Sequence, residues 1–314
     1  MAERVSPAPR DGQEQSVPAA AASDIGLRLM HRKQKSLWGD AWRRLLRNRL
    51  ALAGLIVVVV FCLMAIFAPF LARQSIDYQD ALSLYQPPSR AHVMGTDQLG
   101  RDVLSRVIWG SRVSLLVGLV AQLIVLAIGV PVGALAGFFG GKTDLVLMRF
   151  VDVMYAFPQL LFVILLMSMW GRGLTNIFIA IGLTGWVTLA RLVRAQFLAL
   201  REKDYVLAAR SIGATNSRLM LRHLLPNTLT PIIVALTFGI PTAIFTEAFL
   251  SFINVGISPP QTSWGLMVGE NQSYLRSYPW MLVWPSIALG LTMLSFTFLG
   301  DGLRDALDPS SKRD

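Results

Sequence analysis

The residues from Ala136 to Thr143 read AGFFGGKT, and their types could bind a nucleotide phosphate. A phosphate-binding loop cradles phosphates with backbone N–H groups and a lysine, which here would be Lys142. Such a loop follows a buried strand and opens a helix in an α/β fold. The residues before this motif instead belong to a long apolar stretch, and no acidic apolar strand follows it. We therefore interpret the glycines as a tight turn and expect no nucleotide site here.

No other short pattern indicates catalysis or a metal centre. The sequence contains neither His-Glu-x-x-His nor Gly-x-Ser-x-Gly, the signatures of zinc proteases and of serine hydrolases. His31, His92 and His223 lie far apart, and Cys62 is the single cysteine, so neither a ligand-spaced pair nor a disulfide is predicted. We expect no catalytic residue, no bound metal and no cofactor.

Glu247 stands almost alone as an ionisable residue within the apolar stretches. A carboxylate in such a position usually faces a cavity or a partner rather than lipid. Glu247 could therefore line a substrate pathway or lock an outer gate, or it could pair with an arginine at the outer surface, which we favour. An ion-coupled carrier would bury more polar groups at the membrane midplane. The energy source is therefore expected in a partner.

A second group of charged residues precedes the second apolar stretch. Its charged members are Asp97, Arg101 and Asp102. We expect the charged side chains to form an ion network that braces the next span, in preference to a substrate site. The predicted outer-loop motif consists of Gly95, Asp97, Gly100, Arg101 and Asp102.

The elements that must position these residues are apolar helices. Hydrophobic residues make up 54% of the 314 residues and charged residues only 15%, against about 25% charged in soluble domains. A helix needs roughly 20 apolar residues to cross a bilayer. The stretch 248–269 is too polar for a span and is expected to be an extracytoplasmic loop, partly re-entrant. The sequence thus predicts an all-α integral membrane protein with six transmembrane helices, near 50–71, 114–138, 152–171, 174–192, 228–250 and 279–300.

The distribution of lysine and arginine predicts the orientation. Placing both termini in the cytoplasm puts 22 of the 29 basic residues on that side, in keeping with the positive-inside tendency. Residues 73–112 and 251–278 are then outside, while 139–149 and 195–226 are inside. The net charge of +10 follows from topology, so no nucleic acid partner is expected.

The two ends of the chain differ from the spans in composition. Residues 1–26 lack an apolar core and are expected to form a disordered cytoplasmic tail. Residues 27–49 are basic and amphipathic, which suits either a helix on the anionic lipid leaflet or a plain anchor for the first span, 50–72. Residues 113–304 are expected to form the core transmembrane domain, and residues 305–314 a cytoplasmic C-terminus.

The predicted cytoplasmic loop 204–227 could dock a partner. Asp204 can cap a short helix, Gly213 permits a sharp change of direction, and Thr215 can start a second helix. Small side chains at Ala208 and Ala209 would let these helices sit close to a partner. The alternative is an amphipathic surface loop without a partner.

This loop resembles the EAA motif in the membrane subunits of bacterial ABC importers. That motif reads Glu-Ala-Ala, three residues, Gly, nine residues, then Ile-x-Leu-Pro, and its spacing is complete here. Leu207 stands in place of the glutamate and His223 in place of the isoleucine. A salt bridge that the glutamate normally makes is therefore not expected here. The positions that match or adjoin the pattern, and that the resemblance assigns to ATPase coupling, are Ala208, Ala209, Gly213, Ala214, Leu225 and Pro226.

Three further stretches are similar to dipeptide, oligopeptide and nickel permeases: 95–106, 250–260 with 263–265, and 299–309. The resemblance covers about residues 40–309. It implies a type I ABC-importer permease in the bacterial cytoplasmic membrane, with a second permease, two ATPase subunits and an extracytoplasmic binding protein as partners. The implied cargo is a di- or oligopeptide. Alternatives are nickel or another small solute, or a secondary carrier without an ATPase.

Overall fold

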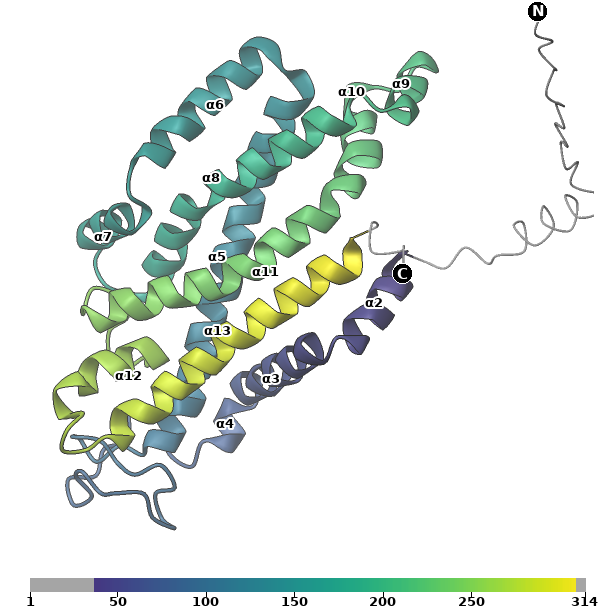
Figure 1. The fold of residues 1–314 in the computed structure, drawn as a ribbon. Helices are drawn as coiled ribbons and strands as arrows, with labels where there is room; N and C mark the ends of the chain where they lie inside the picture. The colour runs from purple at the N-terminus through teal and green to yellow at the C-terminus, as the bar shows by residue number, and fades with distance from the viewer. Residues whose placement is uncertain (1–36, 309–314) are drawn as a thin grey trace, which may run out of the picture. The chain divides into compact units, whose positions relative to one another are not determined.

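The computed structural model describes residues 37–308, and within this range it contains helices and no named strand (Figure 1). The chain divides into two units, 1–40 and 41–314. The predicted tail 1–26, residues 27–36 and residues 309–314 lie outside the described residues. The helices are α2 (Leu37–Arg47), α3 (Arg49–Ile66), α4 (Ala68–Leu71), α5 (Val103–Phe139), α6 (Gly141–Ala156), α7 (Gln159–Trp170), α8 (Leu174–Leu200), α9 (Asp204–Ser211), α10 (Asn216–Arg218), a π-helical turn (Leu219–Leu224), α11 (Leu225–Phe252), α12 (Trp264–Asn271), a 3₁₀ turn (Gln272–Tyr274) and α13 (Trp280–Leu307).

Among these residues, five helices are long and apolar enough to cross a membrane, or six if the bent pair α6–α7 is one span. The five are α3, α5, α8, the continuous helix Asn216–Phe252, and α13. Each contains most or all of one of the apolar stretches predicted as spans. The segment between α11 and α12 lacks the length for a span, as predicted from its prolines and polar residues.

Helix α5 starts at Val103, so the prediction that residues 103–112 belong to a loop is wrong. The carboxylate of Asp102 caps the helix by accepting a hydrogen bond from the backbone N–H of Ser105 at 2.8 Å. Arg106 is paired with Asp97 inside the protein, which removes the cost of placing its charge in a buried helix. A charged first turn can therefore extend an apolar helix.

The third predicted span is not one straight helix. Helices α6 and α7 meet at an angle of 83°, and the break contains Phe157 and Pro158. Proline lacks a backbone N–H and restricts the residue before it, so a helix usually ends there. The break leaves Gln159 as the first residue of α7, with an exposed side chain.

Helices α5 and α8 pack with their backbones in close contact. Gly129, Gly133 and Gly137 follow one another at intervals of four residues on α5 and are all buried. A Cβ atom at Gly129 would lie 2.9 Å from the carbonyl oxygen of Trp186, and one at Gly137 would lie 2.7 Å from that of Arg194. Small residues allow such close approach of two helices, and here they place α8 directly against α5.

Two contacts define the ends of the bundle. After α8, Arg201 donates a hydrogen bond to the carbonyl oxygen of Gly137, near the end of α5, at 3.2 Å. After α7, Arg172 donates to the carbonyl oxygen of Ile257, in the segment between α11 and α12, at 2.7 Å. We call the end that contains Arg201 the α9 end and the end that contains Arg172 the α12 end. Figure 1 shows α9 near the junction of α5 and α6, and α12 near the loop that follows α4. The pair α6–α7 runs from the first end to the second.

Candidate functional site

At the α12 end, four charged side chains form an ion network. Asp97 is fully buried and accepts from Arg101 Nε at 2.6 Å and from Arg106 Nη1 at 2.8 Å. Glu270, on α12, accepts from Arg101 at 3.1 Å and from Arg106 at 2.8 Å. The ion network predicted from Asp97 and Arg101 is therefore present, and it joins the loop to α5 and α12. Glu270 was not predicted, because only the fold brings it to its partners.

Asp102 does not take part in this network, contrary to the prediction. Its carboxylate caps α5 and accepts from the hydroxyl of Ser105 at 2.8 Å, and it lies 3.1 Å from His92 Nδ1. The two glycines of the motif have positive φ angles, +77° at Gly95 and +70° at Gly100. Because side-chain-bearing residues rarely adopt these angles, glycine shapes the turns that bring Asp97 to the arginines.

The rest of the loop is ordered by local hydrogen bonds and by aromatic contacts. Asp80 accepts from the hydroxyl of Ser83 at 2.7 Å and from the backbone N–H of Leu82 at 2.9 Å. These bonds favour the ionised carboxylate and hold the pKa of Asp80 below its ordinary value. Tyr85 stacks on Tyr278, with ring centroids 4.5 Å apart. The loop is thereby attached to the segment that leads into α13.

Glu247 is fully buried on α11, and its surroundings differ from both predicted environments. Its Oε1 accepts from the hydroxyls of Ser251, at 2.8 Å, and Ser263, at 2.6 Å. Ser263 is the N-cap of α12 and also accepts from the backbone N–H of Leu266. Among the described residues no arginine contacts Glu247, so the favoured arginine pair is wrong. Glu247 instead joins the end of α11 to the start of α12.

The predicted docking loop begins with α9. Asp204 is the first residue of this helix, and Lys203 occupies the N-cap without a side-chain bond, so the predicted cap by Asp204 is wrong. Val206 and Ala209 are buried, whereas Ala208 is exposed. Exposed apolar side chains also occur along and just after α9: Tyr205, Leu207 and Ile212, the last 87% exposed. This surface fits a docking element.

Gly213 follows α9 with φ +87°, and a Cβ atom there would meet nothing within 4 Å. The sharp turn predicted at this position is confirmed. Thr215 caps the next helix by accepting from the backbone N–H of Arg218 at 3.4 Å, also as predicted. That helix is not separate, however. It passes through the π-helical turn into α11 without interruption, with Leu225 and Pro226 inside it.

The glycines of AGFFGGKT form the predicted tight turn. Gly140 and Gly141 have φ angles of +64° and +51° and connect α5 to α6. Arg201 lies close to Gly140, and Lys142 is exposed in the first turn of α6. The preceding element is a 37-residue helix, whereas a phosphate loop follows a strand.

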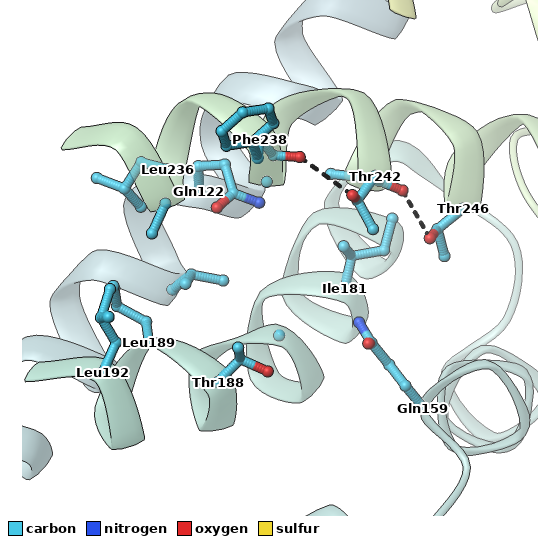
Figure 2. A pocket seen from close by; sticks show the side chains of 15 residues that line it. Gln122, Gln159, Ile181, Thr188, Leu189, Leu192, Leu236, Phe238, Thr242 and Thr246 are labelled. Atoms are coloured by element: carbon cyan, nitrogen blue, oxygen red, sulfur yellow. Dashed lines mark hydrogen bonds between the residues drawn. The ribbon is translucent and has the colours of Figure 1, made fainter. Parts of the chain in front are cut away.

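A cavity of about 420 Å³ lies between α5, α7, α8 and α11 (Figure 2). None of its lining residues carries an ionisable side chain. The hydroxyls of Thr242 and Thr246 donate to carbonyl oxygens one turn earlier in α11. The sequence analysis did not predict this site, although neutral polar residues within apolar stretches were a usable signal. The polar lining residues are Gln122, Gln159, Thr188, Thr242 and Thr246.

Comparison with known proteins agrees with this arrangement. Residues 129–313 match the family described as binding-protein-dependent transport system inner membrane component. Residues 36–88 match the N-terminal transmembrane domain of oligopeptide transport permease C.

Similar proteins cover nearly the whole chain. The oligopeptide transport system permease protein OppC of Bacillus subtilis (strain 168) is 45% identical over 94% of this chain and 96% of its own. The dipeptide transport system permease protein DppC of the same strain is 46% identical over 87% and 86%. The glutathione transport system permease protein GsiD of Escherichia coli O6:K15:H31 (strain 536 / UPEC) is 41% identical over 88% and 91%.

A solved structure supports the fold. A chain of the MetNI methionine ABC transporter, in an inward-facing conformation, matches with a TM-score of 0.54 at 20% identity, over 65% of this chain and 97% of that chain. Helices long and apolar enough to cross a membrane, with a cavity between them, define a polytopic membrane protein. The chain belongs to the inner membrane component family of binding-protein-dependent transport systems, whose members are ABC-importer permeases rather than enzymes.

Proposed function

We propose that this chain forms one half of the transmembrane path of an ATP-driven importer of di- and oligopeptides. It would work with a second permease, two ATPase subunits and an extracytoplasmic binding protein. The names of the relatives support the cargo, because oligopeptides, dipeptides and glutathione all contain peptide bonds. This favours a peptide over nickel or another small solute.

One observation supports coupling to an ATPase. The helix Asn216–Phe252 is continuous over 37 residues. It starts beside α9 and includes Thr242 and Thr246, which line the cavity. A displacement of α9 by an ATPase would therefore move a wall of the cavity. Contacts that differ between two states of the ATPase would in this way shift the conformational equilibrium of the cavity. We assign the ATPase contact to the loop that contains Ala208, Ala209, Gly213, Ala214, Leu225 and Pro226.

We further propose six spans with both termini in the cytoplasm. The path of α6–α7 from the α9 end to the α12 end supports its treatment as one crossing. The excess of basic residues supports placing the α9 end in the cytoplasm. The basic segment 27–49 and the C-terminus 305–314 would lie on the same side. The loops at the α12 end would then face the binding protein. In α2, exposed Trp42 and Leu46 would contact lipid of the inner leaflet.

The test is Gly213→Pro in the complete importer, reconstituted in vesicles with its binding protein. Proline fixes φ near −65° and cannot adopt the observed +87°, so α9 would change direction relative to Asn216–Phe252. We expect loss of peptide uptake and of binding-protein-stimulated ATP hydrolysis, with all subunits still co-purifying. Gly141→Pro is the matched control, because Gly141 has φ +51° and equally open surroundings but lies in the turn between α5 and α6, outside the docking loop.

Normal uptake by the Gly213→Pro importer would contradict the coupling role of this loop. Uptake by vesicles that contain the permeases without the ATPases, driven by an ion gradient, would favour a secondary carrier instead.

A further inference from the structure

The cavity contains two side-chain amides, which come from different helices. Gln122 projects from α5 toward α11, and Gln159 projects from the start of α7 (Figure 2). Two further polar residues of the lining, Thr242 and Thr246, lie on α11. Their hydroxyls donate hydrogen bonds to carbonyl oxygens of the same helix. Thr188, on α8, adds one hydroxyl to the lining, whereas each amide offers two donors and an acceptor to a solute.

Gln122 makes no side-chain hydrogen bond with any residue in the range 37–308. Its amide lies against Gly239 on α11, where a Cβ atom would be 2.6 Å from the amide carbon and 2.9 Å from Nε2. The absence of a side chain at Gly239 thus gives the amide its place on the cavity wall. Without a partner in this range, the amide keeps its two donors and its acceptor available to a solute in the cavity.

Gln159 stands where two cavities meet. It lines the first cavity and also a second one, of about 330 Å³, which Met154, Phe157 and Thr188 help to form. Gln159 and Thr188 are common to both. Gln159 Nε2 makes one long hydrogen bond, 3.4 Å to the hydroxyl of Thr184, and within the described chain its Oε1 accepts none. A solute that moved between the cavities would pass beside Gln159 and Thr188, the two residues that line both.

We propose that Gln122 and Gln159 are specificity-determining residues that bind the peptide groups of the passing solute. A primary amide offers two donors and an acceptor, which match the C=O and N–H groups of a peptide bond. Because the lining carries no ionisable side chain, the site recognises the backbone and gives little discrimination by charge. This inference rests on the proposed function, in which the cavity is part of the path.

The test compares complete importers in vesicles, all with the same binding protein, so that its own preference cancels between variants. The variants are Gln122→Leu, Gln159→Leu and the double variant, which remove the amides at similar volume. Gln196→Leu is the matched control, because Gln196 is half-buried on α8 outside the cavity lining. The probes are labelled trialanine and trialanine with a methylated central amide nitrogen. Solute transported per ATP hydrolysed is measured together with stimulated ATP hydrolysis.

We expect each leucine variant to lower trialanine transported per ATP by about two- to tenfold, the factor that loss of one neutral hydrogen bond produces. The methylated peptide should be affected less, so the preference for trialanine falls. Stimulated ATP hydrolysis should remain, which a merely structural defect would not allow. Gln159→Asn, which keeps an amide, should retain the preference, and Gln159→Met replaces Gln159→Leu if the latter fails to assemble.

An unchanged preference in the double variant, or an equal change in Gln196→Leu, would overturn the assignment of the amides while peptide import itself stands. Absence of ATP-dependent uptake of both probes by the unaltered importer would overturn the proposed function, and this inference with it.

Discussion

Replacement of Arg106 by methionine tests the ion network at the α12 end. The side chain of Arg106 is 4% exposed and donates to Asp97 at 2.8 Å, Glu270 at 2.8 Å and Thr262 at 3.1 Å. Methionine keeps most of the volume but leaves the fully buried Asp97 with Arg101 as its single cationic partner. Breaking a buried ion pair from one side costs about 3–5 kcal/mol. Because Arg101 remains, we expect a loss of about 3 kcal/mol in the free energy of unfolding.

The assay is unfolding of the purified permease in mixed micelles by increasing fractions of SDS. Arg112→Met is the matched control, because Arg112 lies exposed on the same helix and makes no ion pair within residues 37–308. Two further variants are Asp97→Asn alone and Asp97→Asn combined with Arg106→Met, which removes both charges. Since most of the cost comes from the unpaired buried carboxylate, the double variant should lose less stability than the sum of the two single variants.

Two results would refute this reasoning. One is a change for Arg106→Met within about 0.5 kcal/mol of the unaltered protein, the range of ordinary surface substitutions. The other is strict additivity in the double variant, which would mean that Asp97 and Arg106 do not interact energetically.

Three further predictions concern packing, topology and the glycine turn. Gly133→Val should destabilise the permease by about 1–3 kcal/mol in the same unfolding assay, because a Cβ atom there would lie 2.8 Å from that of Val193. A cysteine at exposed Ser217, introduced into a Cys62→Ser background, should react with a membrane-impermeant thiol reagent only after the cells are opened; labelling of intact cells would reverse the orientation. Lys142→Ala should leave ATP hydrolysis by the assembled importer unchanged, and its loss would restore the phosphate-loop interpretation of this exposed lysine.

Local features were predictable from the sequence because their causes lie within a few residues. The Gly140–Gly141 turn, the sharp change at Gly213 and the pairing of Asp97 with Arg101 all arise this way. The start of α5 was missed because charged residues were taken to end a span. Arg106 pairs with Glu270, 164 residues further along the chain, and no local pattern indicates that contact.

The cavity shows the same limit for the functional site. Gln122 and Gln159 belong to different helices, and a neutral amide within an apolar stretch does not by itself indicate that the two share a cavity. Their common position depends on the bend between α6 and α7, on close packing of α5 against α8, and on the missing side chain at Gly239. Glu247 was singled out as an ionisable residue within an apolar stretch, but one of its partners, Ser263, lies beyond a turn whose course the sequence leaves open, whereas Ser251 lies four residues further along the same helix.

The π-helical turn Leu219–Leu224 gives the length of the docking loop a geometric meaning. Each residue of an α-helix advances the chain by about 100° around the axis, and a π turn holds an extra residue. Deleting one residue there would restore an ordinary α-turn and leave α9 in nearly the same direction, whereas inserting a further residue would rotate α9 by roughly 100° about the long helix. The number of residues between Gly213 and Pro226 therefore sets the orientation of the docking surface about the axis of the long helix. Changes of residue type, such as those at Leu207 and His223, alter only what that surface presents.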